Sequence, residues 1–346
     1  MSIQPTRPLW LLLDSAKAGG IESHVYELSL ALSERGFPVE VIFLQDHGDH
    51  PLKSRLTGAG VPWRSLGGPR TLAPALRRER PGLVHTHGYK AGILGRMACR
   101  LLGIPCCSTF HSGDPGAGRV RLYTTLDRLT AGWAPVMAVS DAIAEDLGGC
   151  PVPPNFIAPP QPVGPGRSIA FVGRFAEEKG ADLLPSLALA LPHRAFRAFG
   201  DGPLYRGVVR AGPPNLLFQG AVASMENHWD GIGLLVMPSR AEGLPMAALE
   251  AMGRGIPVAA FGVGALPGLL DQGRGWAVEP GNTASLVQAL NAWDKEPPDA
   301  RAQRAAKCRI KVLADHSPEA ALSVILPVYE KAGLLAAPAS LRGQAA

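Results

Sequence analysis

Glu242 and Glu250 are acidic residues separated by seven positions in the segment LLVMPSRAEGLPMAALEAMGRGIPVAA, residues 234–260. An apolar run precedes Glu242, and Pro245 fits the first turn of a short helix that contains Glu250. A helix N-terminus offers unpaired N–H groups and a partial positive charge, and both attract phosphate. The segment therefore predicts a loop carboxylate, a phosphate-sized anion site and a second carboxylate. The alternative is that Glu242 caps the helix and Glu250 is a solvated helix residue.

A second group of charged residues lies in FVGRFAEEKG, residues 171–180. Arg174 follows an apolar run and a glycine, and Lys179 stands five residues later. Charge-assisted hydrogen bonds from arginine and lysine to phosphate oxygens are strong, so these cations fit a diphosphate leaving group without a metal. We expect their partners to be ligand oxygens rather than protein groups. The alternative is a surface ion pair of Lys179 with Glu177 or Glu178.

The first half of the chain has two candidate ligand contacts. Gly19 and Gly20 lie in the turn 18–22, where glycine leaves backbone N–H groups uncovered for close approach of a ligand. His111 follows an apolar run, and its neutral imidazole fits a hydrogen bond to a sugar hydroxyl. For His111 the alternative is a histidine satisfied within the core.

No metal site is predicted from the histidines. His85 and His87 occur together in HTHG, but we find no third ligand at a matching spacing. The motifs GxGxxG, GxxxxGK[ST], GxSxG and HExxH do not occur in the sequence. Dinucleotide reduction, P-loop hydrolysis, triad esterolysis and zincin chemistry therefore lack their usual sequence support.

Short apolar runs alternate with helical patterns along the whole chain, which predicts parallel sheets covered by helices on both faces. Residues 151–166 contain seven prolines and predict a linker. The expected fold class is α/β, with two doubly wound Rossmann-like domains that face a cleft. We expect an N-terminal domain over 1–160, a C-terminal domain over 166–316 and a final helix over 317–334.

Charge is distributed unevenly in this globular composition, in which 46% of the residues are hydrophobic and 18% are charged. The formal net charge is +5, yet residues 51–130 alone carry +10, whereas 1–50 carry −4 and 131–165 carry −3. The basic segment fits either a solvated helical face or a surface for acidic lipid headgroups or a phosphorylated acceptor. We expect Arg77, Arg78 and Arg80 to face such a partner. Nucleic acid is not expected, because the segment has no aromatic interleaving and no recognition motif.

Five cysteines without C-x-x-C spacing argue against a disulfide framework and a cysteine zinc site. The longest apolar runs fall far short of the roughly 20 residues of a membrane-spanning helix, and no secretory signal is legible. We therefore expect a cytoplasmic protein, peripheral on the inner face of the cell membrane where the basic segment binds lipid.

Five segments together resemble the retaining GT-B glycosyltransferases of family 4, namely GGIE, HTHG, GRFAEEKG, GDGPL and EGLPMAALEAMGRGIPVAA. The spacing of the two glutamates, with its EGLP and EAM-x-x-G-x-P flanks, is the most specific of these. The resemblance implies that Arg174 and Lys179 bind the donor diphosphate. It implies further contacts with the nucleotide sugar from Gly19, Gly20, His111, Glu242, Gly243, Leu244, Pro245 and Glu250, with Glu242 at the sugar and Glu250 at the ribose. It also implies that the final helix returns to the N-terminal domain.

By this resemblance the protein is a retaining hexosyltransferase with Glu242, His111, Arg174 and Lys179 as its catalytic residues. We expect a nucleotide diphosphate sugar as donor, with uridine as its base, and a glycan or lipid-linked acceptor in bacterial envelope polysaccharide, lipopolysaccharide or glycolipid synthesis. No cofactor or metal is expected. Two alternatives stay open: a nucleotide sugar epimerase of the same fold and a non-catalytic donor-binding subunit.

Overall fold

The computed structural model describes residues 7–16, 19–111, 118–222 and 224–334. The chain divides into two compact units, of which unit 1 is Met1–Ala158 with Pro318–Ala346 and unit 2 is Pro159–Ser317. The sequence placed the end of the first domain at 160 and the start of the final helix at 317. Ala18, the first residue of the predicted glycine turn, lies outside the described residues, as does Lys17 before it.

Unit 1 contains a six-stranded parallel sheet in the order β3-β2-β1-β4-β5-β6. The strands are β1 (Leu9–Leu13), β2 (Val39–Phe43), β3 (Trp63–Ser65), β4 (Leu83–His87), β5 (Cys106–Phe110) and β6 (Val136–Ala138). This is the doubly wound order, in which successive strands are added first on one side of β1 and then, from β4 onward, on its other side. The carboxyl ends of these two strands are therefore the expected place for a ligand.

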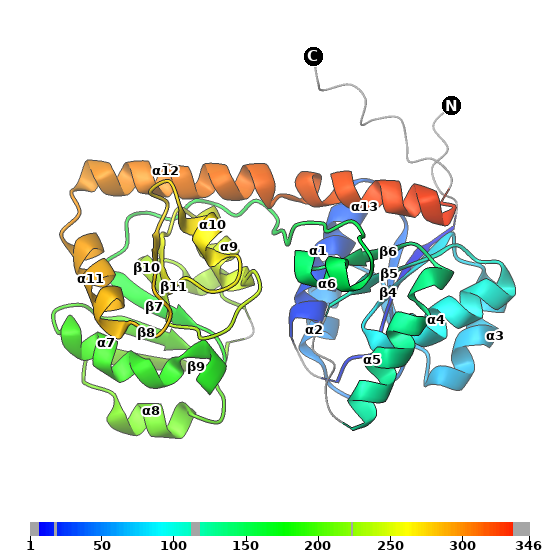
Figure 1. Ribbon diagram of the computed structural model, residues 1–346, viewed down its shortest axis with the longest axis horizontal. Coiled ribbons are helices and arrows are strands. Elements are labelled where there is room, and N and C mark those ends of the chain that lie inside the picture. The colour runs from blue at the N-terminus through cyan, green and yellow to red at the C-terminus, as the bar shows by residue number, and fades with distance from the viewer. Residues whose placement is uncertain (1–6, 17–18, 112–117, 223, 335–346) are drawn as a thin grey trace, which may run out of the picture. The chain divides into compact units, whose positions relative to one another are not determined.

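Helices cover both faces of this sheet (Figure 1). They are α1 (Gly20–Glu34), α2 (Pro51–Gly58), α3 (Pro69–Glu79), α4 (Tyr89–Leu102), α5 (Arg119–Leu129), η1 (Ala131–Trp133), α6 (Asp141–Asp146) and α13 (Pro318–Ala332). Alternate residues of β1 enter two different cores, since Leu11 packs with α1, α2 and α13 while Leu12 packs with α3 and α4. The final helix α13 belongs to this unit, as expected, and buries Leu322 and Tyr329 beside α1.

Unit 2 repeats the same topology, with strand order β12-β11-β10-β7-β8-β9. The strands are β7 (Ser168–Val172), β8 (Phe196–Phe199), β9 (Leu216–Gly220), β10 (Ile232–Met237), β11 (Val258–Phe261) and β12 (Trp276–Val278). The first and fourth strands of this unit, β7 and β10, are again neighbours. The predicted fold class, two doubly wound α/β domains, is confirmed.

The helical segments of unit 2 are η2 (Glu177–Lys179), η3 (Ala181–Leu183), α7 (Leu184–Ala190), α8 (Tyr205–Ala211), η4 (Glu226–His228), α9 (Met246–Gly253), α10 (Leu266–Leu270), α11 (Thr283–Asp294) and α12 (Pro298–Asp315). The core on one face of the sheet joins strand residues such as Phe171 and Leu234 to Leu184 of α7 and Leu290 of α11. Among the helices of the described residues, none is long and apolar enough to span a bilayer.

Candidate active site

The carboxyl ends of β7 and β10 bring the two charged segments of unit 2 together. Arg174 follows β7 and Lys179 ends η2, while Glu242 lies in the loop between β10 and α9. Two hydrogen bonds hold the turn around Arg174, from Gly173 N to Phe199 O (3.0 Å) and from Phe175 N to Asp201 O (3.0 Å).

Lys179 and Glu242 form a bidentate ion pair. Nζ of Lys179 donates to Oε1 and Oε2 of Glu242 at 2.7 and 2.8 Å, and the Glu242 side chain is only 6% exposed. Arg174 pairs with Glu178 at an exposed position. The expectation that neither cation has a protein partner is therefore wrong, because a carboxylate this buried needs a counter-charge even before ligand binds. The alternative pairing of Lys179 with Glu177 or Glu178 does not form, since Lys179 reaches across to the neighbouring strand end.

A close backbone approach fixes this pair. Gly180 has a φ of +64°, and a Cβ atom there would lie 1.9 Å from the carbonyl oxygen of Pro238, at the end of β10. The same two segments are joined by Arg240, whose N–H donates to Glu178 O at 2.8 Å. The guanidinium of Arg240 also donates to both carboxylate oxygens of Asp182, at 2.8 and 2.7 Å.

The loop that carries Glu242 leads into α9. Gly243 O accepts a hydrogen bond from Ala265 N at 3.0 Å, and a Cβ atom at Gly264 would lie 2.2 Å from Glu242 O. Pro245 is the N-cap residue rather than part of the first turn, and no side chain caps α9 at this position. The difference is one residue, and it leaves the helix N-terminus where the phosphate site is predicted. Glu250 lies within α9 and is half-buried, and Leu244 lies in the loop.

The predicted residues of unit 1 lie around one cavity of about 590 Å³. Gly20 and His111 line it, and Gly19 is the N-cap residue of α1, where no side chain makes a capping hydrogen bond. Asp14 was not predicted, although it follows β1 directly and lines the cavity. Its carboxylate bonds Nε2 of His47 at 2.9 Å and pairs with Nζ of Lys90 at 3.0 Å.

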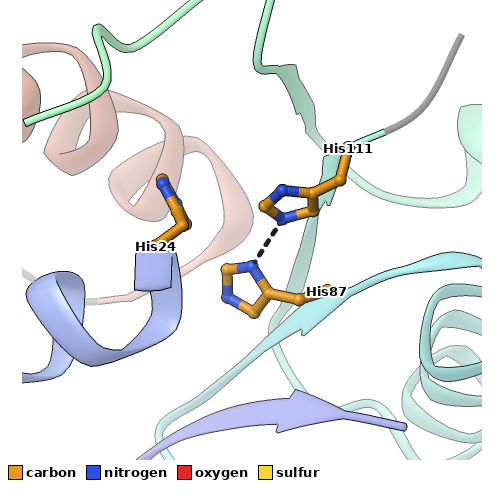
Figure 2. A group of neighbouring side chains, drawn as sticks. All are labelled: His24, His87 and His111. Carbon is orange, nitrogen blue, oxygen red and sulfur yellow. Dashed lines mark hydrogen bonds between the residues drawn. The ribbon is translucent and has the colours of Figure 1, made fainter. Parts of the chain in front are cut away.

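His111 belongs to a cluster of three histidines that come from α1, the end of β4 and the residue after β5 (Figure 2). Nδ1 of His87 and Nε2 of His111 are 3.1 Å apart, and the His24 ring centroid lies 5.2 Å from that of His111. Burial lowers the pKa of His24 to about 4 and holds the pKa values of His87 and His111 well below their usual range. All three imidazoles are therefore neutral at pH 7.

His24 was missed in the sequence, and the reason given against a metal at HTHG was wrong. A third and a fourth histidine reach HTHG because α1 carries His24 and the neighbouring parallel strand β5 leads into His111, whatever their spacing along the chain. His85 is a satisfied core histidine, since its two ring nitrogens bond Tyr329 Oη at 2.8 Å and Thr109 Oγ1 at 2.7 Å.

The basic segment 51–130 is only partly a surface. Arg96 is buried and donates to Ser108 Oγ at 2.8 Å and to Thr130 Oγ1 at 2.7 Å, and it pairs with Asp127 at 2.5 Å. Arg64 is bound by Glu40 and by Glu79. The charges that do face solvent include Arg77, Arg78 and Arg80, all exposed at the end of α3.

Comparison with known proteins agrees with this geometry. Residues 18–159 match the family model described as Glycosyltransferase Family 4, and residues 166–293 match the model described as Glycosyl transferases group 1. The chain is 28% identical to the 2-deoxystreptamine N-acetyl-D-glucosaminyltransferase of Streptomyces fradiae over 318 residues, which covers 72% of this chain and 76% of that protein. It is 30% identical to the 2-deoxystreptamine glucosyltransferase of Streptomyces kanamyceticus over 305 residues, 69% of this chain and 75% of that protein.

The crystal structure of Alr3699/HepE from Anabaena in complex with UDP superimposes with a TM-score of 0.78 at 18% identity, covering 94% of this chain and 100% of that structure. HepE has also been solved with UDP-glucose. The two family models cover both halves of the chain, and the Streptomyces relatives extend over most of its length. The chain therefore belongs to the family 4 glycosyltransferases of the GT-B fold.

Proposed function

We propose that this glycosyltransferase is a retaining hexosyltransferase that moves a sugar from a UDP-sugar to a hydroxyl acceptor. The observation that carries the donor assignment is the Lys179–Glu242 pair at the joined ends of β7 and β10, next to the N-terminus of α9. The binding of UDP and UDP-glucose by HepE, a protein of the same fold, supports uridine as the base.

Leaving-group stabilisation is the main chemical task of the proposed reaction. Departure of the diphosphate leaves an oxocarbenium-like sugar, so positive groups around the diphosphate lower the barrier. Lys179 has three ammonium protons and donates two of them to Glu242, so the third is available for a hydrogen bond to a phosphate oxygen. Arg174, largely exposed, supplies the second cation, and the N–H groups at the start of α9 supply the third positive element.

The remaining site residues have binding roles in this proposal. Glu242, with Gly243, Leu244 and Pro245, binds the donor sugar, and Glu250 binds the ribose. Gly19, Gly20 and His111 of unit 1 contact the sugar and phosphate during transfer. Attack from the face that the leaving group occupies retains the anomeric configuration, and the departing phosphate accepts the acceptor proton.

Two measurements test the donor and the stereochemistry. Acceptor-dependent UDP release should require a UDP-sugar and should fall about a hundredfold in Arg174→Ala, whereas Arg210→Ala, an exposed arginine on α8, should keep wild-type turnover. NMR of the fresh product should show the anomeric configuration of the donor. An inverted product would refute retention, and equal turnover in the two arginine variants would refute the cation's role.

We also propose that the donor diphosphate binds without a metal, because fixed cations already meet its charge. UDP affinity measured by calorimetry should be the same in EDTA and in magnesium. A dependence of UDP affinity on magnesium would contradict this.

For the acceptor we propose a lipid-linked envelope glycan, reached at the cytoplasmic face of an anionic membrane. The side of unit 1 formed by α4, α5 and η1 exposes large apolar side chains, namely Met97, Leu101, Val120, Leu122, Leu126, Leu129 and Trp133. Exposed arginines lie among them, and Arg100 stacks over Trp133 at 5.8 Å. Apolar side chains interleaved with arginines suit the headgroup region of a bilayer.

Vesicle binding tests this surface. Anionic vesicles should bind at low salt and less at high salt. Binding should fall in Leu122→Ser with Leu129→Ser and also in Arg77→Glu with Arg78→Glu, which lie on α3, the helix that packs beside α4. Ile310→Ser removes an equally exposed apolar side chain from unit 2 and should have no effect. Lack of binding by the wild-type protein at low salt would refute the membrane proposal.

A soluble aminocyclitol is the second candidate acceptor. The two Streptomyces relatives are named for transfer to 2-deoxystreptamine. Three carboxylates line the unit 1 cavity, those of Asp14 and Asp127, which pair with Lys90 and Arg96, and that of Glu22, and carboxylates suit an acceptor that carries ammonium groups. This candidate would be favoured over a lipid-linked glycan if 2-deoxystreptamine increases the rate of UDP release and the protein does not bind anionic vesicles.

A further inference from the structure

We propose that unit 1 binds one transition-metal ion of the Zn²⁺ class through His24, His87 and His111, at the inner wall of its cavity. Figure 2 shows the three side chains near one another, with His87 and His111 pointing toward each other, on α1, the end of β4 and the residue after β5. One ligand nitrogen from each ring can be chosen so that all three lie within 4.8 Å of one another.

The geometry of the cluster is close to that of a metal site. Zinc–nitrogen bonds of about 2.0–2.1 Å in a tetrahedron place ligand nitrogens about 3.4 Å apart. Nδ1 of His87 and Nε2 of His111 are already 3.1 Å apart. The His24 ring belongs to a set in which one nitrogen of each ring lies within 4.8 Å of the others, and rotation about the side-chain bonds is needed to bring that set to the tetrahedral spacing.

Two buried nitrogens of the cluster lack partners. Nε2 of His24 and Nε2 of His87 are buried and have no hydrogen-bond partner among the residues that the structure describes. An unpaired buried polar atom costs about 1–3 kcal/mol, so an ion bound at Nε2 of His24 would be favoured, whereas Nε2 of His87 stays unpaired when Nδ1 of His87 is the ligand. Burial also keeps the rings neutral, with the pKa of His24 at about 4, and the neutral imidazole is the form that binds metal.

The donor set selects the class of ion. Imidazole nitrogen suits zinc, copper and nickel, whereas magnesium and calcium prefer oxygen ligands. Three histidines leave a fourth tetrahedral position for water or another oxygen ligand, as in open zinc sites. That position has access to the solvent, since His24 and His111 line the cavity.

The ion would compete with sugar transfer rather than support it. In the proposed function, His111 hydrogen-bonds a sugar hydroxyl, and an ion that takes its ring nitrogen removes that contact. Zn²⁺ should therefore inhibit transfer, with relief by EDTA. This consequence rests on the proposed function, whereas metal binding itself does not.

The binding test uses the full chain without a polyhistidine tag, first freed of metal with a chelator. Calorimetric titration with Zn²⁺ should show one equivalent bound, and Co²⁺ should give the visible absorption of a tetrahedral nitrogen site. His111→Gln and His24→Gln should each weaken Zn²⁺ at least tenfold. His193→Gln, which changes an exposed histidine of unit 2, should bind as the wild type does.

Two results separate this proposal from the proposed function. Absence of stoichiometric Zn²⁺ binding by the wild-type protein, or wild-type affinity in His111→Gln, would overturn the metal site even if UDP-sugar transfer is confirmed. Stoichiometric binding in a protein that transfers no sugar would retain the site and overturn only the function. If His24→Gln does not fold, the metal site is still tested by the Zn²⁺ affinity of His111→Gln, which changes a half-buried residue. It is also tested by the Tm of the wild-type protein, which should rise when Zn²⁺ is added.

Discussion

Replacing Lys179 by alanine removes the counter-charge of Glu242, whose side chain is only 6% exposed. Losing a buried ion pair's partner costs about 3–5 kcal/mol, and the 29% exposure of Lys179 reduces this to roughly 2 kcal/mol. In a unit of this size, about 2 kcal/mol lowers Tm by roughly 4–8 °C. Turnover should also fall about a hundredfold, because the same ammonium is proposed to meet the diphosphate.

Calorimetry of ligand-free protein, alongside UDP release, separates the two effects. Lys179→Ala with Glu242→Gln should recover most of the lost Tm while turnover stays low, since the unpaired charge is then gone. Arg174→Ala should keep the wild-type Tm, because its pair with Glu178 lies in solvent and contributes little. A wild-type Tm in Lys179→Ala, or no recovery in the double variant, would refute the idea that this pair stabilises the loop.

Three further outcomes follow from the packing. Gly180→Ala should lower Tm well beyond Gly281→Ala, because both glycines have positive φ but only the first would press a Cβ against backbone; equal losses would contradict this. In metal-free protein, Tm should fall as pH drops from 7 to 5. Burial lowers the pKa values of His24, His85, His87 and His111, so the unfolded chain takes up protons below about pH 6.5 that the folded chain does not. A Tm that stays constant down to pH 5 would contradict this. Arg96→Met should lower the free energy of unfolding of unit 1 by several kcal/mol, measured with denaturant, because it leaves Asp127 buried without its cation. Adding Asp127→Asn to Arg96→Met should restore much of this loss.

Strand positions were predictable where apolar runs are continuous and buried. The apolar runs of the sequence did not reveal two strands, β3 and β12, which have three residues each. β3 is an edge strand of the unit 1 sheet, and β12 is an edge strand of the unit 2 sheet. Their residues are only partly buried, or exposed, so β3 reads as Trp-Arg-Ser and shows no apolar run. Edge strands this short depend on the sheet beside them, and local sequence carries little signal for them.

The partners of charged residues were much harder to predict than their positions. Concentrated charge in 51–130 suggested one basic surface, yet Arg64 and Arg96 are bound by carboxylates from distant parts of unit 1. Lys179 likewise bonds a carboxylate 63 residues away, not either of its neighbouring glutamates. Such pairs depend on which strands are adjacent, and counting charges along the chain cannot reveal that.

Strand order explains why both units gather reactive side chains at equivalent places. In each sheet the first and fourth strands are neighbours, so the residues that follow them meet at one edge. In unit 2 this edge joins Lys179 to Glu242, and in unit 1 it joins Asp14 to Lys90. The adjacent pair β4 and β5 places His87 beside His111 at the same edge. Knowing that order in advance would have directed attention to every histidine near these strand ends, including the one on α1. The same topology thus supports an ion pair suited to a diphosphate in one unit and a neutral imidazole cluster in the other, and only the residues after each strand make the difference.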